Sequence, residues 1–187
     1  MRYALIALLA ASASLGAQNV SRRPVVVEER AAAHSDVKSI DAIMRTFYDV
    51  ISGPVGTPRQ WSRDRGLYVK EVRFYVLSER NGAMRMNASS HQQYVESFDS
   101  SSTAQGFVEL EIARCVRRFG NLATVWSAYE GYHGAGATRT SAGRGVNAVQ
   151  LYWDGTRWWI TSVSWDSERP GNPLPDKASL CRDVQSH

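Results

Sequence analysis

The sequence of 187 residues is short of cysteine, histidine and lysine, with two, four and three of them. Two cysteines are too few for a disulfide-dense scaffold or a zinc site with four cysteine ligands. No two histidines have the spacing that would place both on one face of a helix or strand, so we expect no metal site. No apolar run reaches the ~20 residues of a membrane-spanning helix, so no membrane span is expected.

The positive charge is small and dispersed. Lys and Arg together number 22 against 18 Asp and Glu, a formal net charge of +4. The 19 arginines are scattered, and no basic run is longer than a pair such as Arg22-Arg23 or Arg117-Arg118. Nucleic-acid binding needs basic side chains clustered on one face or stripe. We therefore exclude nucleic acid as a partner.

The first 17 residues have the pattern of a secretory signal peptide. Met1-Arg2 give a positive start, Ala4 to Ala11 are uninterruptedly apolar, and small residues lead to Ala17. That order predicts export to the periplasm or medium, with cleavage after Ala17. Residues 18–34 mix charges with short apolar runs, which is typical of a linker or extended arm.

An apolar stripe predicts a helix over residues 36–51. Its members recur at helical spacing: Ile40, Ile43, Met44, Phe47, Val50 and Ile51. Ser35 is expected to cap this helix, and Gly53-Pro54 to end it.

Two further helices are predicted from capping-box patterns. Thr57 and Gln60 would open a short second helix, with Pro58 at its first position. Ser90 and Gln93 would open a third, which we expect to end before the polar stretch that starts at Asp99.

The remaining chain is predicted to form strands. Residues 69–77 are β-branched and aromatic, and residues 107–119 and 122–133 have period-two alternation around Gly120-Asn121. Residues 134–145 are rich in Gly and Ala and are expected to be a loop. Residues 146–153 and 157–165 then form the clearest hairpin.

The hairpin turn sets an expected register. Asp154-Gly155 is a preferred two-residue turn, which would pair Trp153 with Thr156. Leu151 would then face Trp158, and Val149 would face Ile160. The opposite face is expected to carry an amphipathic set: Gln150, Tyr152, Arg157, Trp159, Thr161 and Trp165.

The order of these elements resembles the NTF2-like superfamily, which includes the SnoaL-like proteins. The resemblance covers residues 36 to about 168, through the segments IDAIMRTFYDVI, LYVKEVRFYV and VNAVQLYWDGTRWWITSVSWDSE. It implies an α+β cone in which three N-terminal helices pack on a curved, mainly antiparallel sheet. Residues 35–168 would form this domain, and residues 169–187 a C-terminal tail containing proline.

The resemblance also implies an apolar conical cavity that could take a small apolar or aromatic ligand, and no cofactor. Proteins of this superfamily often dimerise through the outer sheet face. Here Trp159 and Trp165 would anchor such a homodimer. The superfamily includes isomerases, dehydratases and hydrolases as well as non-catalytic pockets, so the fold alone does not select a function.

The candidate acid–base residues are Tyr48, Tyr94, Glu130 and His133. Glu130 shares a strand face with Trp126 and Tyr132, and burial there would raise its pKa as a general base requires. The alternative is an outer face, where Glu130 would pair with an arginine. Tyr48 and His133 could equally lie at the surface, and spacing places no Asp beside His133.

Aromatic residues are the candidate ligand-pocket lining: Trp61, Tyr68, Trp126 and Trp158. Cys115, within a strand, and Cys181, in the tail, could form a disulfide in an oxidising compartment. The alternative is two free thiols.

The interpretation favoured by these residues is an exported domain that binds a small molecule or a partner without catalysis. The alternative is a cofactor-independent isomerase, dehydratase or hydrolase of the SnoaL or ketosteroid isomerase type. A third possibility is a structural dimer.

Overall fold

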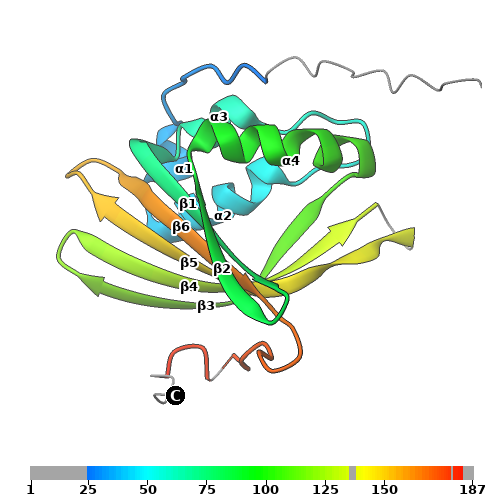
Figure 1. Cartoon of the computed structure of the whole chain (residues 1–187). Coiled ribbons are helices and arrows are strands. Elements are labelled where there is room, and N and C mark those ends of the chain that lie inside the picture. Colours follow the sequence, from blue (N-terminus) through cyan, green and yellow to red (C-terminus); the bar gives the residue numbers. More distant parts are fainter. Residues whose placement is uncertain (1–24, 135–137, 178, 183–187) are drawn as a thin grey trace, which may run out of the picture.

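The computed structural model describes residues 25–134, 138–177 and 179–182, with helices on one face of a curved sheet (Figure 1). The predicted signal peptide, residues 1–17, lies outside the described residues. The elements in chain order are α1 His34–Val37, α2 Ile40–Ile51, α3 Trp61–Arg65, β1 Tyr68–Arg80, β2 Ala83–Ser89, α4 His91–Gln105, β3 Val108–Phe119, β4 Leu122–His133, β5 Thr140–Trp153 and β6 Trp158–Ser167.

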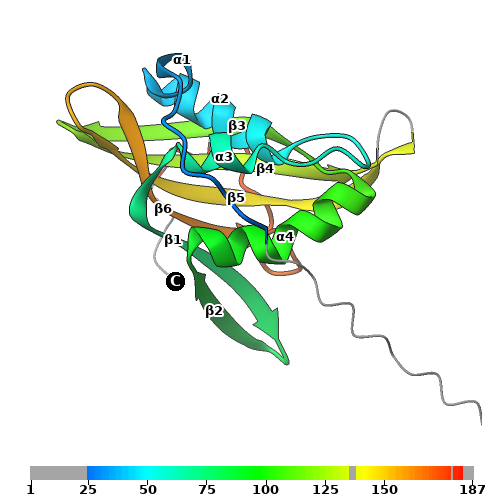
Figure 2. The ribbon, with the colours of Figure 1, turned by 90° about the horizontal axis from the view of Figure 1, so that it is seen from above.

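The described strands form one sheet of six, in the order β2-β1-β6-β5-β4-β3. β1 and β6 pair in parallel, and every other neighbouring pair is antiparallel. Seen from above, the helices lie over the sheet and the β1–β2 hairpin projects to one side (Figure 2). The predicted α+β architecture with a mainly antiparallel sheet is therefore confirmed.

The prediction of three N-terminal helices holds only in part. The opening helix is divided into α1 and α2, because Ser39 is extended and its side chain accepts a hydrogen bond from the Ala42 amide at 3.1 Å. Ser39, and not Ser35, is thus the cap of α2. In addition, α4 follows the first hairpin of the sheet.

The predicted capping box at Thr57 is wrong. α3 begins at Trp61, and no side chain caps it. The reason is the buried Arg59, whose Nη2 donates to the carbonyls of Pro54 at 2.9 Å and Thr57 at 2.7 Å. The loop wraps around this guanidinium and cannot adopt the predicted helical turn.

The capping box at the start of α4 is confirmed. The Ser90 hydroxyl accepts from the Gln93 amide at 3.3 Å, and the Gln93 side chain accepts from the Ser90 amide at 2.9 Å. The helix continues through the polar stretch to Gln105, past the expected end. Gly106, at φ 68°, ends it with a backbone conformation that favours glycine.

Two strands differ from the prediction: one was not predicted at all, and another begins earlier than expected. Asn81 and Gly82, at φ 54° and 73°, form a tight turn that leads into β2, a strand the sequence pattern did not indicate. β5 begins at Thr140, so residues 140–145 of the predicted loop are strand.

The predicted register of the β5–β6 hairpin is wrong by two residues. Trp153 pairs with Trp158 and Leu151 with Ile160, across a four-residue loop. The cause is Asp154, whose side chain accepts from the amides of Thr156 at 2.7 Å and Arg157 at 2.9 Å. These local bonds stabilise a wider turn than the two-residue one.

A β-bulge in β6 changes which residues face inward. Gln150 and Leu151 are adjacent on β5, but their partners are Ser162 and Ile160, so Thr161 is the extra residue. Beyond the bulge the alternation reverses. Trp165 therefore faces the helices and packs on Tyr94, with 6.2 Å between ring centroids. The prediction that Trp165 shares the outer face with Trp159 is wrong.

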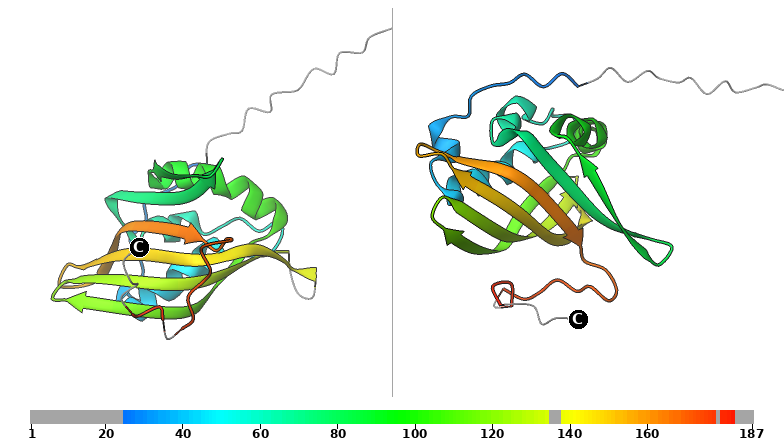
Figure 3. Two further views of the ribbon diagram at one scale, coloured as in Figure 1. Left: turned by 60° about the horizontal axis from the view of Figure 1, so that its bottom comes forward. Right: turned by 60° about the vertical axis from the view of Figure 1, so that its left-hand side comes forward.

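The C-terminal tail runs along the sheet face opposite the helices (Figure 3). Cys115 of β3 and Cys181 of the tail form a disulfide, and Leu180 packs against Cys115 and Ala128. The main core lies on the other face, between the sheet and the helices, and includes the fully buried Ile43, Leu67 and Val149.

Candidate functional site

The concave sheet face and the helices above it enclose a cavity of about 250 Å³. Its walls are largely aromatic: Phe47, Phe74, Tyr94, Phe98, Phe107, Tyr129 and Trp165. Phe74 and Tyr94 stack with 4.6 Å between ring centroids. Such walls suit a flat apolar molecule.

Glu109 is the acidic side chain of this cavity. It lies near the start of β3, opposite Gly131 of β4, and both residues line the cavity. The adjacent Leu110 points outward and is 44% exposed. The charged face of this strand thus turns toward the core, the reverse of what alternation between charged and apolar residues normally indicates.

Burial changes the acidity of Glu109. Removal from water raises its pKa from 4.5 to about 7, opposed by a hydrogen bond from Asn147 Nδ2 to Oε1 at 3.1 Å. None of the described residues that line the cavity is Lys, Arg or His. Near neutral pH the carboxyl can therefore both accept and release a proton, as a general acid–base group must.

Tyrosine hydroxyls supply the other titratable groups. Burial raises the pKa of Tyr94 and Tyr129, so both stay protonated and can donate hydrogen bonds. The charges of Asp64 and Glu109 add to this at Tyr94, and the charge of Glu109 adds to it at Tyr129. Tyr129 lies over Gly145 of β5, where a Cβ would come within 2.7 Å of the tyrosine oxygen. The glycine makes room for this ring.

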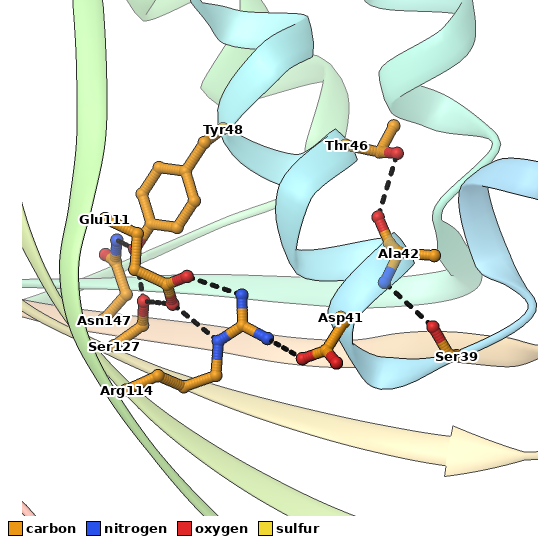
Figure 4. Close-up of polar contacts among 9 residues, drawn as sticks. All are labelled: Ser39, Asp41, Ala42, Thr46, Tyr48, Glu111, Arg114, Ser127 and Asn147. Carbon is orange, nitrogen blue, oxygen red and sulfur yellow. Dashed lines mark hydrogen bonds and ion pairs between the residues drawn. The ribbon is translucent and has the colours of Figure 1, made fainter.

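A polar cluster lies behind the cavity wall (Figure 4). Tyr48 of α2 points toward the sheet, with its hydroxyl 2.6 Å from Ser127 Oγ and 3.2 Å from Asn147 Nδ2. Ser127 also donates to Glu111, which pairs with Arg114. Burial raises the pKa of Tyr48, so its hydroxyl stays protonated.

The four acid–base candidates lie in different places. Tyr94 lines the cavity, and Tyr48 reaches it through Asn147. Glu130 lies on the outer sheet face, between Tyr132 Oη at 2.7 Å and Arg144 Nη1 at 3.5 Å. His133 ends β4, and its Nδ1 donates to the Gly106 carbonyl at 3.2 Å. Neither Glu130 nor His133 is part of the cavity lining.

The four pocket candidates lie outside the cavity lining. Trp61, Tyr68 and Trp158 are core residues, at most 6% exposed. Trp126 lies on the outer face, where with the tail it lines a separate hollow of about 490 Å³. Trp159 of β6 is covered by the Arg157 guanidinium, 3.5 Å from the ring centroid.

Sequence reasoning missed two sets of residues. Glu109 and Asn147 lie in strands whose apolar and polar residues alternate. Only knowledge of which strand face points into the cavity could have identified them. The second set contains His91, whose Nε2 lies 2.7 Å from Asp64, and Asp64 also accepts from Tyr68 Oη at 3.0 Å. These buried groups connect α3, β1 and α4, and they lie outside the cavity lining.

Within the described residues, no three His, Cys, Asp or Glu side chains converge as metal ligands would. In the same part of the chain, no helix combines the length and apolarity needed to cross a membrane.

No protein-family model and no curated protein sequence matches this chain. Solved structures do. A variant of Rv3472, a protein of unknown function from Mycobacterium tuberculosis, superposes with a TM-score of 0.52 at 16% identity, over 70% of each chain. Kfla4162 from Kribbella flavida gives 0.52 at 14% identity, over 71% of this chain and 90% of its own.

A third structure comes from Novosphingobium aromaticivorans and is provisionally assigned as a scytalone dehydratase. It superposes with a TM-score of 0.51 at 13% identity, over 71% of this chain and 83% of its own. At such identities the likeness concerns the fold. The chain has the NTF2-like fold, as the sequence predicted.

Proposed function

We propose that the cavity binds a small neutral molecule and that Glu109 moves a proton on it, in a cofactor-independent isomerisation or dehydration. One observation carries this proposal: a carboxyl group with a pKa of about 7 lies in an aromatic cavity without a cation among its described lining residues. An anionic ligand would find no positive counter-charge among these lining residues, so we propose a neutral molecule.

The chemistry follows from the groups present. The Glu109 carboxylate would take a proton from a carbon next to a carbonyl group. In an isomerisation the protonated carboxyl would return that proton to another carbon, and in a dehydration it would give the proton to the hydroxyl group that leaves the neighbouring carbon as water. A tyrosine hydroxyl, from Tyr94 or Tyr129, would donate to the oxygen on which negative charge develops. The aromatic walls would keep water away from the intermediate. The donor Asn147 would stabilise Glu109 while it is ionised.

The test starts with ligand binding and then follows hydrogen exchange, so the reaction product need not be identified. Small neutral ketones and cyclic alcohols are screened for binding by NMR, and bound compounds are incubated with the protein in D₂O. Proton transfer by Glu109 predicts exchange of carbon-bound hydrogen for deuterium. We expect Glu109→Gln to slow exchange by at least ~100-fold while binding persists.

Glu130→Gln is the matched control, since it removes an equivalent carboxylate from the outer face. It should exchange deuterium at the wild-type rate. Exchange that survives Glu109→Gln would show that Glu109 is not the base. Binding without exchange for any ligand would establish the non-catalytic pocket favoured from the sequence.

We also propose that the protein is exported. The pattern of residues 1–17 supports this, and the Cys115–Cys181 disulfide fits an oxidising compartment. The mass of the chain recovered from the periplasm or medium of an expressing bacterium tests it. A mass beginning at Gln18 is expected, and an intact Met1 in those fractions would contradict cleavage.

A further inference from the structure

The cavity carboxyl of Glu109 is connected to an ion pair outside the cavity by a chain of hydrogen bonds. Figure 4 draws the members of this chain from Arg114 to Asn147. Arg114 Nε donates to Glu111 at 2.8 Å, and Ser127 Oγ donates to the same carboxylate oxygen. Ser127 contacts the Tyr48 hydroxyl at 2.6 Å, and the Asn147 amide nitrogen contacts that hydroxyl at 3.2 Å. The same nitrogen reaches Glu109 Oε1 at 3.1 Å.

The direction of every bond in this chain follows from the number of protons available. A carboxylate in an ion pair only accepts, and Glu111 is paired with Arg114, so the single Ser127 proton goes to Glu111. Ser127 can then only accept from Tyr48, and the single tyrosine proton is used there. The Tyr48 oxygen in turn can only accept, so Asn147 must present its NH₂ group.

We infer that Glu111, Ser127 and Tyr48 are positioning residues that hold Asn147 as a hydrogen-bond donor to Glu109. The hydrogen-bond geometry does not depend on catalysis, and only the role of Glu109 in proton transfer rests on the proposed function. Because Asn147 is held in this orientation, its carbonyl oxygen cannot turn to accept a proton from Glu109. This chain of hydrogen bonds thus stabilises the ionised Glu109 carboxyl, and it leaves the protonated Glu109 carboxyl without an acceptor at Asn147.

Other groups around Glu109 are uncharged near neutral pH or belong to an ion pair. Tyr94 of α4, Tyr129 of β4 and Tyr48 of α2 are all uncharged near neutral pH. The facing residues of β1 and β6 are Phe74, Val163, Trp165 and Ser167, which do not titrate. Glu111, on the same strand, is neutralised by Arg114.

The experiment measures the titration of the Glu109 side-chain carboxyl by ¹³C NMR in the full mature chain without any ligand. Ser127→Ala removes one link and changes no charge. It frees the Tyr48 proton to bond the Asn147 carbonyl oxygen, so the amide can turn and accept from protonated Glu109. We expect the midpoint of the Glu109 titration to rise by about half to one pH unit.

Tyr48→Phe should raise the midpoint in the same direction, and it serves if Ser127→Ala fails to fold. The controls are Ser164→Ala and Tyr152→Phe, which make the same chemical changes on the outer sheet face. They should leave the midpoint where it is in the wild type. Circular dichroism establishes that each variant is folded.

A midpoint that stays unchanged or falls in both folded cavity variants would overturn the positioning role. So would an equal rise in the outer-face controls, since that would indicate a general loss of packing. The outcome is independent of turnover: the titration can move as expected while no ligand exchanges deuterium, and the proposed function then fails alone.

Discussion

At the scale of single residues, Glu109 couples the cavity to protein stability. Its pKa is raised in the folded chain from 4.5 to about 7, so between these values the native state binds more protons than the unfolded state. The free energy of unfolding therefore falls as the pH rises through this window. Above and below it, Glu109 contributes no further pH dependence.

Replacement of Glu109 by Gln should remove this dependence. Relative to the wild type, the variant should gain up to about 3 kcal/mol between pH 4 and pH 8, because the cost of ionising a buried carboxyl disappears. Urea unfolding at both pH values measures the difference. Glu130→Gln, on the outer face, should follow the wild type, and a parallel pH profile for Glu109→Gln would contradict the raised pKa.

Sequence reasoning left the position of Glu130 open between the two faces of the sheet. Glu130 was either a carboxyl among aromatics in the cavity or the partner of an arginine on the outer face, and it lies on the outer face with Tyr132 and Arg144. Glu109 was not accessible to such reasoning, since its strand alternates in a way that normally directs Leu110 into the core. Leu110 lies on the edge strand β3, where it is 44% exposed.

At the scale of elements, α4 brings the aromatic rings Tyr94 and Phe98 to the cavity, so its N-terminal cap stabilises the cavity wall as well as the helix. Ser90→Ala removes one half of the capping box. It should lower the free energy of unfolding by about 1 kcal/mol. Urea denaturation followed by circular dichroism provides the measurement.

Ser101→Ala is the control for the cap. Ser101 is exposed within α4 and bonds only the Phe98 carbonyl three residues earlier, so its loss should cost less than about 0.5 kcal/mol. Equal effects of the two substitutions would show that the capping box contributes no more than an ordinary helical serine.

Elements with local signals were the predictable ones. The Ser90–Gln93 capping box, β3 and β4 were predicted closely. The reason is that capping residues, period-two alternation and the turn between β3 and β4 can all be recognised from residues close together in the sequence. The β5–β6 register failed because Asp154 stabilises a longer turn. The bulge at Thr161 is set by how β6 meets both of its neighbours, which adjacent residues do not encode.

At the scale of the whole molecule, the disulfide ties the tail to the sheet. It joins residues 66 apart in sequence. Closing such a loop restricts the unfolded chain, and its reduction should lower the free energy of unfolding by up to about 4 kcal/mol. Denaturation with and without a phosphine reductant measures this, and thiol titration in denaturant without reductant should find none.

The double variant Cys115→Ser, Cys181→Ser is the control, because reductant should leave its stability unchanged. Two reactive thiols in the untreated wild-type protein would rule out the bond.

The overall architecture was predictable, since the order of elements resembled a known fold. The cavity was not, because its contents depend on strand faces that only the assembled sheet determines.

The bulge at Thr161 has a consequence for how such a cavity can diversify. One extra residue decides whether Val163 and Trp165 or Ser164 and Asp166 look toward the helices. A change of chain length by a single codon would therefore exchange an aromatic wall for a hydroxyl and a carboxylate, with no amino-acid substitution at all. In this strand, insertion and deletion are a route to a different cavity lining that comparison of aligned side chains would overlook.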